Sequence, residues 1–421
     1  MSEDFLHFIW KTRQWSNPCK TVSGKEFEVL DTGIHNKDAG PDFFNAKIKI
    51  DDTIWAGNVE IHKSAGDWFA HNHHRDPAYN NVIMHVVAEN NKPINTKEGR
   101  KPETWVMNFP QSTFKQYEKL VQSIFTIPCK DDLHKVNPTE IIMWLQSIAI
   151  QRFIHKAKEI EKRLVRERMD IDTAFYQTIF RQFGFKVNQL PFDMLGRSIN
   201  WKVLARHRHN LRQLEAMLFG QAGFLKGDMN DEYFRELKEE YRFLKNKFQL
   251  DNIEPHLWKF SRMRPGNFPE IRIAQLAGIM YHEQRLFSNL AGAGDIEQIK
   301  KLLTYPASEY WDTHYRFGRK APRKYKKKPG DMAIKSIVIN VVVPFLFMYA
   351  RIRDEQKYAD KALMFLEELP PESNRIVREW ETLGIKPANA LESQAMIQLK
   401  NKYCLEKKCL FCSIGHEIIS K

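Results

Sequence analysis

Two short motifs near the N-terminus contain carboxylates that could share one metal ion. They are Gly40–Asp42 (GPD) and Gly57–His62 (GNVEIH). Hydrolysis of a phosphodiester needs hard oxygen ligands that converge on a divalent cation, which polarises a phosphoryl oxygen and acidifies a bound water. We expect Asp42 and Glu60 to be catalytic ligands of Mg²⁺ or Mn²⁺, with His62 positioning or activating water. The alternative is that Asp42 belongs to a turn and that Glu60 is a solvated strand residue.

Further histidines follow the second motif. His71 and His73 lie between the predicted third and fourth strands, where they would stand near the carboxylates. Imidazole is a common metal ligand. A metal site of a protein that is not a nuclease, built on His62, His71 and His73, is therefore a competing interpretation.

The C-terminal segment contains a cysteine cluster. Cys404, Cys409, Cys412 and His416 have a spacing that can complete a tetrahedral zinc site. The same three cysteines could instead hold an iron–sulfur cluster if a distant cysteine supplied the fourth ligand, and both Cys19 and Cys129 are available. The third possibility is thiols without a metal. A bound metal would have a structural role and fix the C-terminus.

The chain is basic. Among its 421 residues, 65 Lys and Arg exceed 52 Asp and Glu, which gives a formal charge of +13. The densest basic run, residues 315–328, alternates cations with aromatic residues, a composition that suits contact with phosphates and unpaired bases. A nucleic-acid partner, DNA or RNA, is expected, with contacts from Arg319, Lys320, Arg323 and Lys324. A solvated loop is the alternative, and the oligomeric state cannot be inferred.

Hydrophobic patterning predicts an α+β protein. A helical stripe at residues 4–15 precedes three alternating strands at 25–30, 42–50 and 53–62, and an apolar strand at 81–88 follows a polar connection. This order gives an α-β-β-β-α-β core within a domain of residues 1–130, with one more strand at 104–108. A larger, mainly helical domain is expected over residues 138–421, with helices in the following ranges: 138–168, 172–185, 211–219, 231–248, 271–291, 295–303, 334–353 and 389–403.

The longest apolar run is Ile337–Ala350. It contains Asn340 and Pro344 and is short for a bilayer span, so we expect a buried helix kinked at the proline. The N-terminus lacks a basic segment followed by an apolar one, the pattern of a secretory signal. A cytoplasmic protein without membrane contact is therefore expected.

The two acidic motifs resemble those of the PD-(D/E)XK nuclease superfamily over roughly residues 5–90. The match consists of Pro41-Asp42, Glu60 and Ile61. The resemblance implies the α-β-β-β-α-β core, metal binding by Asp42, Glu60 and the Ile61 carbonyl, and nuclease activity. The chain departs from the motif at position 62, where His replaces Lys. Lys63 is one residue further along, on the opposite face of the strand.

Two other resemblances concern the cysteines and the whole chain. Cys19 upstream of the core and three cysteines near the C-terminus are similar to the pattern of "iron-staple" nucleases, although the spacing of the last three departs from C-x2-C-x5-C. Nearly the whole chain resembles a bacterial family of domains of unknown function, number 2851. That match is carried by these segments: 40–43, 57–62, 262–265, 267–269, 393–394 and 404–415.

The expected function is that of a metal-dependent nucleic-acid phosphodiesterase. It follows from the acidic motifs and the basic charge together, because the first supply metal ligands and the second favours a polyanionic substrate. The alternative is a catalytically inactive nucleic-acid-binding or scaffold protein on the same core. Substitution of Asp42 or Glu60 would abolish cleavage under the first interpretation only.

Overall fold

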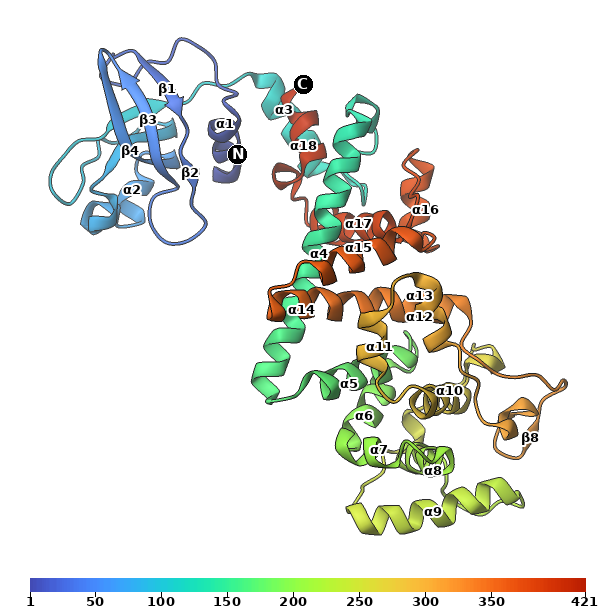
Figure 1. Cartoon of the computed structure of the whole chain (residues 1–421). Coiled ribbons are helices and arrows are strands. Elements are labelled where there is room, and N and C mark those ends of the chain that lie inside the picture. Colours follow the sequence, from blue (N-terminus) through green and yellow to red (C-terminus); the bar gives the residue numbers. More distant parts are fainter. The chain divides into compact units, whose positions relative to one another are not determined.

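A computed structural model describes residues 1–421, and the chain divides into two compact units. The sheet unit comprises Met1–Trp144 and Leu399–Lys421, and the helical unit comprises Leu145–Gln398. Figure 1 shows the strands confined to the N-terminal part of the chain, apart from a short pair in the helical unit, and helices in the remainder. The α+β class expected from the sequence is confirmed. The last residues of the chain, which the sequence analysis assigned to the helical domain, belong to the sheet unit.

The sheet unit is built on a six-stranded mixed sheet of order β1-β3-β4-β5-β6, with β2 paired to β3. The three strands β1, β3 and β4 are antiparallel neighbours, and β5 and β6 continue the sheet in parallel to β4. The strands are β1 (Phe27–Asp31), β2 (Ile34–His35), β3 (Phe43–Ile50), β4 (Thr53–Ser64), β5 (Val82–Glu89) and β6 (Glu103–Val106).

Alternation of side chains explains β3 and its hairpin with β4. Phe43, Ala46, Ile48 and Ile50 of β3 are buried and most of the residues between them are exposed. The register shifts between Phe43 and Ala46, so a bulge lies where β3 begins. All five strands that the sequence predicted are present; β2 was not expected.

Helix α1 (Glu3–Thr12) packs against this sheet. Ser2 caps its N-terminus by accepting a hydrogen bond from the Phe5 N–H. The apolar stripe predicted from the sequence is buried, and its Trp10 packs near Phe43 and Trp105 while donating to the Thr32 carbonyl at 2.9 Å. The helix thereby fixes the end of the sheet at which β3 begins.

The connection from β4 to β5 must cross over, because these strands are parallel. It contains α2 (Asp67–Ala70) and two 3₁₀ turns, His73–Arg75 and Pro77–Tyr79. Trp68 anchors it: this side chain is fully buried in a cluster with Tyr79, Val82 and Ile94 and donates to the Asn95 carbonyl. The crossover therefore holds its own histidines over the sheet.

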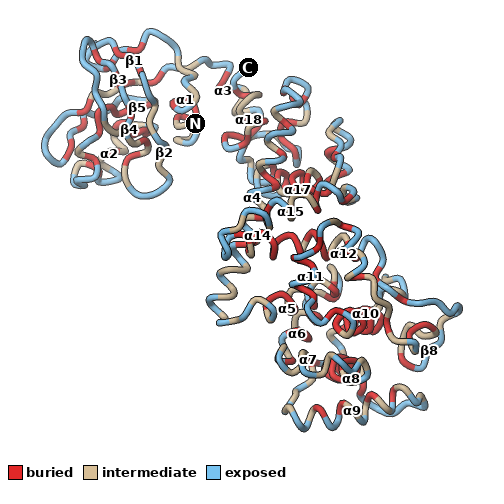
Figure 2. Tube along the Cα trace, in the orientation of Figure 1, coloured by how far each residue is buried: buried red, intermediate tan, exposed pale blue.

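The core of the helical unit includes one helix that is buried on nearly all sides. Helix α10 (Pro269–His282) is buried almost throughout, its polar Glu270, Arg272 and Gln275 included, and Figure 2 shows it as one of the most continuously buried segments. The single helix expected over 271–291 is two helices, α10 and α11 (Leu286–Gly292). Buried Glu283 ends the first, and its carboxylate accepts hydrogen bonds from Tyr305 and Asn289.

The apolar run around Pro344 forms a continuous helical segment, Asp331–Arg353. It consists of α13 (Asp331–Ile337), a π-helical turn (Val338–Val342) and α14 (Val343–Arg353). The widened turn directly precedes Pro344, whose ring and missing N–H do not fit a regular helix. By length and composition the segment could cross a membrane, but 72% of its most apolar window is buried inside the protein. That burial agrees with the core helix expected from the sequence.

The remaining elements have the following bounds. In the sheet unit they are α3 (Gln111–Gln122), a 3₁₀ turn (Leu133–Lys135), a π-helical turn (Lys400–Cys404), a 3₁₀ turn (Cys409–Phe411) and α18 (Ser413–Ser420). Helix α4 (Pro138–Glu167) begins in the sheet unit and continues into the helical unit. The helical unit further contains α5 (Ile171–Phe183), α6 (Gln189–Ser198), α7 (Trp201–His207), α8 (Leu211–Gln221), α9 (Glu232–Phe248), α12 (Ile296–Leu303), β7 (His314–Arg316), β8 (Arg319–Lys320), α15 (Lys357–Glu368), α16 (Arg375–Thr382) and α17 (Ala390–Leu399).

Candidate metal centre

Strand β4 places Glu60 and His62 on one buried face of the sheet. They are two residues apart and therefore point the same way, and they are only 4% and 2% exposed. In the parallel register Glu60 lies beside His85 of β5. Lys63 is exposed, as expected for the opposite face.

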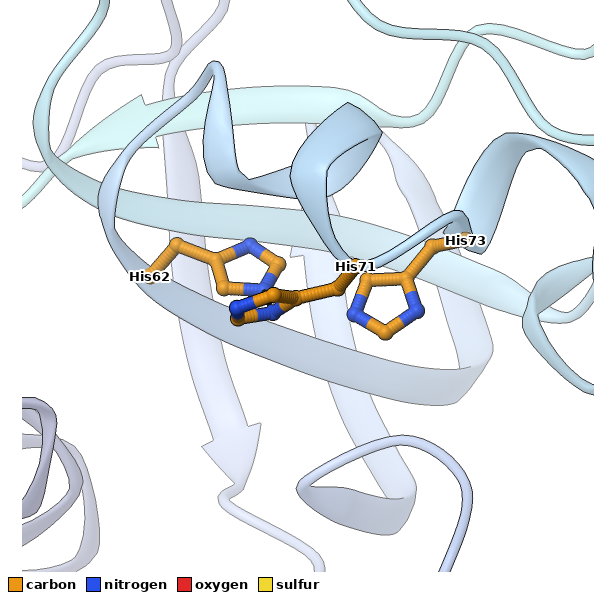
Figure 3. A group of neighbouring side chains, drawn as sticks. All are labelled: His62, His71 and His73. Carbon is orange, nitrogen blue, oxygen red and sulfur yellow. Dashed lines mark hydrogen bonds between the residues drawn. The ribbon is translucent and has the colours of Figure 1, made fainter.

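Two histidines of the crossover complete a cluster with His62. The ligating nitrogens of His62, His71 and His73 all lie within 4.8 Å of one another. Figure 3 shows the three rings gathered beside β4, with His71 and His73 reaching in from the crossover. His62 and His73 are buried, whereas His71 is exposed. The cluster is therefore accessible from solvent through His71.

The Glu60 carboxylate belongs to the same cluster. Its Oε1 lies 3.2 Å from His73 Nε2 and 3.4 Å from His62 Nε2, and His62 Nε2 lies 3.2 Å from His71 Nδ1. Ligands about 2.0–2.1 Å from a tetrahedral zinc ion are separated by about 3.3–3.4 Å. Each of the three separations is that expected between two ligands of one ion; Glu60 contacts His62 and His73, and the three histidines form the closed group.

The orientation of His73 provides a further test of the fit. Although its Nε2 is 3.2 Å from Glu60 Oε1, the two atoms are not aligned for a hydrogen bond, and Nε2 is buried without a hydrogen-bond partner. An unsatisfied buried nitrogen of this kind is uncommon and costs free energy.

His85 supports the cluster from behind. Its side chain is completely buried, and its Nε2 lies 2.9 Å from His62 Nδ1, so the two rings share one hydrogen bond. Such a partner on the far nitrogen fixes the orientation and tautomer of a metal-ligating imidazole. Burial and the neighbouring histidines lower the pKa of His85 to about 3 and that of His62 to about 2. Both rings are neutral, so His62 keeps a lone pair on Nε2 for a metal while its Nδ1 shares the hydrogen bond with His85.

Asp42 and Glu60 meet as the sequence predicted. The Asp42 N–H donates to Glu60 Oε2 at 3.0 Å, and Asp42 Oδ2 accepts a hydrogen bond from the Ile61 N–H at 2.9 Å. Burial, with the charge of Asp42, raises the pKa of Glu60. Two carboxylates in so dry a place require positive charge nearby.

His7 of α1 supplies part of that charge. Its Nε2 lies 3.2 Å from Asp42 Oδ2. Burial alone would lower the pKa of His7, but the close contact with the negatively charged Asp42 carboxylate outweighs it and raises the pKa. Sequence reasoning missed His7 because nothing in its helix marks it. It also missed His85, although a lone histidine in an apolar strand was a visible signal.

The cysteines form a separate cluster in the sheet unit. Cys404, Cys409 and Cys412 line one small cavity together with Cys129, and all four are buried and free of disulfides. His416 lies elsewhere. Its ring packs against Phe8 and its Nε2 contacts the Leu410 carbonyl oxygen.

Cys19, the other distant cysteine that the sequence left open, is also remote from this cavity. Its thiol donates to Asn17 Oδ1 at 3.4 Å. The structure thus brings together the three C-terminal cysteines of the predicted set and adds Cys129, while His416 and Cys19 are bonded to other groups.

The basic run of the helical unit is partly structural. Arg319, Lys320, Arg323 and Lys324 are exposed. In contrast, Lys327 is buried and donates to the Asp312 carbonyl at 2.9 Å. The four cations expected to contact nucleic acid are therefore accessible.

Comparison with known proteins gives one match. The family model described as "Protein of unknown function (DUF2851)" matches residues 3–375. No curated protein and no solved structure matches the chain.

Proposed function

The chain belongs to the DUF2851 family, and from the geometry of its metal-ligating side chains we propose that it is a metal-dependent phosphodiesterase acting on nucleic acid. The observation that carries the proposal is the cluster of His62, His71 and His73, with Glu60 in contact with two of its members and Asp42 beside Glu60. Because one of the ligands, His71, is exposed, the site leaves room for water or substrate.

The order of elements supports a nuclease rather than another metal-dependent hydrolase. Helix α1, three antiparallel strands, a crossover and a parallel strand follow one another, which is the α-β-β-β-α-β order of the PD-(D/E)XK superfamily. Asp42 directly precedes the middle antiparallel strand and Glu60 lies on the next. Net positive charge and the exposed cations of the 315–328 run favour a polyanionic substrate.

The donor set points to a particular group of metals. Three imidazoles with one carboxylate favour ions such as Zn²⁺, Fe²⁺ or Mn²⁺, whereas Mg²⁺ prefers all-oxygen surroundings. We therefore propose Mn²⁺ or Zn²⁺ at this position, and Mn²⁺ was one of the two ions expected from the sequence. An ion bound there would lower the pKa of a coordinated water and polarise a phosphoryl oxygen.

The residues around the ligands have separate roles in the proposal. Asp42 is held by the Ile61 N–H and by His7, so its carboxylate is positioned to accept a proton from an attacking water. His7, whose pKa is raised, supplies positive charge toward a phosphate. In the PD-(D/E)XK motif a lysine supplies this charge, and His62 stands at its position in this chain. His85 keeps the His62 ring in place.

Cleavage assays with matched variants test the proposal. Full-length protein, stripped of metal and reloaded with Mn²⁺ or Zn²⁺, is incubated with labelled single- and double-stranded DNA and with RNA. We expect cleavage of at least one substrate, loss of it in Asp42→Ala and Glu60→Gln, and retention in Asp52→Asn, an exposed turn residue outside the site. Binding without cleavage by the loaded protein would favour the inactive binding protein, and equal activity in Glu60→Gln would contradict the assignment.

A further inference from the structure

Four cysteines from two distant parts of the chain surround one cavity in the sheet unit. Cys129 lies in the turn before α4, and Cys404, Cys409 and Cys412 lie around the last turns before α18. Each is only 6–7% exposed. Unrelated buried thiols would not be expected to line one cavity from segments so far apart in sequence.

The surroundings suit thiolates that share a cation. Four thiolates around a zinc ion, or around a cubane iron–sulfur cluster in its oxidised state, carry a net negative charge. Lys400 and Lys407 lie close enough to Cys404 and Cys409, respectively, to offset part of that charge.

We propose that Cys129, Cys404, Cys409 and Cys412 bind a tetrathiolate metal centre, either a zinc ion or an iron–sulfur cluster. Soft thiolate sets select these centres over hard cations. On binding, the four thiols release their protons to solvent and four metal–sulfur bonds form. The centre fixes the C-terminal segment to the turn before α4. Lys407 reinforces this attachment by donating to the Phe125 carbonyl oxygen at 3.2 Å.

Metal analysis and thiol protection test this site on the full-length protein purified without oxygen. Zinc or iron per chain is counted, acid-labile sulfide and visible absorption separate the cluster from zinc, and alkylation followed by mass spectrometry reports each cysteine. In mild denaturant we expect the four cysteines to resist alkylation while the metal is bound, and Cys19 to be modified. Cys129→Ser should lose the metal, whereas Cys19→Ser and His416→Ala should keep it.

Three results would overturn the proposal. They are a chain without zinc or iron at these residues, retention of the metal in Cys129→Ser, or loss of it in His416→Ala. Because Cys129→Ser could unfold the segment, Cys409→His, which retains a metal-binding side chain, is compared and should keep more zinc per chain than Cys409→Ser. His73→Ala removes a ligand of the histidine site and leaves the four cysteines unchanged. This variant therefore separates a failure of the nuclease proposal from a failure of the cysteine site.

A second, independent observation concerns the helical unit. A cavity of about 730 Å³ is lined by residues 183–192, 262–272, 332–336 and 371–374, a size typical of small-molecule sites. Its walls carry five cations and one carboxylate, Glu372. The cations are Lys186, Arg262, Arg264, Arg272 and Lys335.

Arg272 is buried without a carboxylate to balance its positive charge. It is 8% exposed, its Nη1 donates to Gln275 Oε1 at 3.0 Å, and its Nε has no hydrogen-bond partner. The guanidinium also stacks over the Phe185 ring, 4.6 Å from its centroid. A buried arginine without a carboxylate is unfavourable unless a ligand supplies the charge.

We infer that this cavity binds a nucleoside phosphate. Guanidinium groups bind phosphate oxygens in pairs, and half-buried Phe185 offers aromatic surface to a flat base, while Phe183 and Phe192 behind it are fully buried. Arg264 is exposed at the rim and forms no ion pair, so it is available to the same phosphate.

Calorimetric titration of the full-length chain with the four nucleoside monophosphates, adenosine and inorganic phosphate tests the inference. We expect saturable binding of a nucleoside monophosphate, weakened at least about tenfold in Arg264→Ala and in Arg272→Gln, and unchanged in Arg378→Gln, an exposed residue outside the cavity. Arg264 is exposed, so its variant should fold even if Arg272→Gln does not. Absence of binding, or binding equal in Arg264→Ala, would overturn the inference.

Discussion

Asp42 and Glu60 are joined through the backbone as well as by proximity. The Asp42 N–H donates to Glu60 Oε2 at 3.0 Å, and the Asp42 carboxylate accepts from the N–H of Ile61, the residue after Glu60. This reciprocal arrangement fixes both carboxylates relative to β4. It leaves Glu60 Oε1 in contact with His62 and His73. The two acidic motifs therefore form one structural unit.

Removal of the His85 ring should weaken metal binding without removing a ligand. In His85→Ala, His62 loses the hydrogen bond at its Nδ1 and its ring becomes free to rotate. We expect the affinity for Zn²⁺ or Mn²⁺ to fall about 10–100-fold, the range typical of outer-shell partners. Competition with a chromophoric chelator measures it. His74→Ala, which changes a nearby histidine outside the cluster, is the control, and equal loss in both variants would contradict the role of His85.

Close approach of β4 and β5 requires glycine at position 57. A Cβ there would lie 2.4 Å from Ile83 Cγ2 and 2.7 Å from the Asn81 carbonyl oxygen. Gly57→Ala should lower the free energy of unfolding by about 1–3 kcal/mol, because the strands must separate to admit the methyl group. Thermal and urea unfolding measure the change. Gly266→Ala, where a Cβ meets open space, should leave stability nearly unchanged.

The exposed cations of the basic run should determine the salt dependence of nucleic-acid binding. Replacing Arg319, Lys320, Arg323 and Lys324 by alanine should reduce the slope of log affinity against log salt by about 1 for each phosphate that is no longer neutralised. Fluorescence anisotropy over a salt series measures it. The control replaces Lys162 and Arg166, which are exposed but paired with Glu159 and Glu167. An unchanged slope in the quadruple variant would exclude this run from the nucleic-acid interface.

Glu215 should make the stability of the helical unit depend on pH. Burial raises the pKa of Glu215 to about 7, although Ser308 and Tyr233 donate hydrogen bonds to it. The folded state thus binds the proton more tightly than the unfolded state, and stability is lost as pH rises from about 4.5 to about 7. The difference in unfolding free energy between Glu215→Gln and the parent should therefore change with pH. From pH 4.5 to above pH 7 it should shift in favour of the variant by up to about 3 kcal/mol. Denaturant unfolding at several pH values measures this difference, and a constant difference would contradict it.

Much of the sheet and part of the site were predictable from sequence. Alternation along β3 and β4 places Asp42 and Glu60 at the same end of adjacent strands, and the crossover between parallel strands returns His71 and His73 to that end. His7 was not predictable, because its position depends on how α1 packs on the sheet. Short polar helices such as α16, and the break between α10 and α11, depend on tertiary contacts that periodicity does not report.

The cysteine set shows the same limit. Spacing identified Cys404, Cys409 and Cys412 as a group, but the fourth member depends on which distant segment packs against them. Sequence left His416, Cys19 and Cys129 as alternatives, and the fold places Cys129 at the cavity. No local pattern around Cys129 distinguishes it from Cys19.

The location of a bound ion tests the central claim most directly. Crystals of the full-length protein grown with Zn²⁺ or Mn²⁺ can be measured at the metal absorption edge, which reveals the ion by anomalous scattering. The proposal predicts one peak within about 2.3 Å of Glu60 Oε1 and of ring nitrogens of His62, His71 and His73, absent in His73→Ala. A map with no peak among these four side chains, at saturating metal, would contradict it.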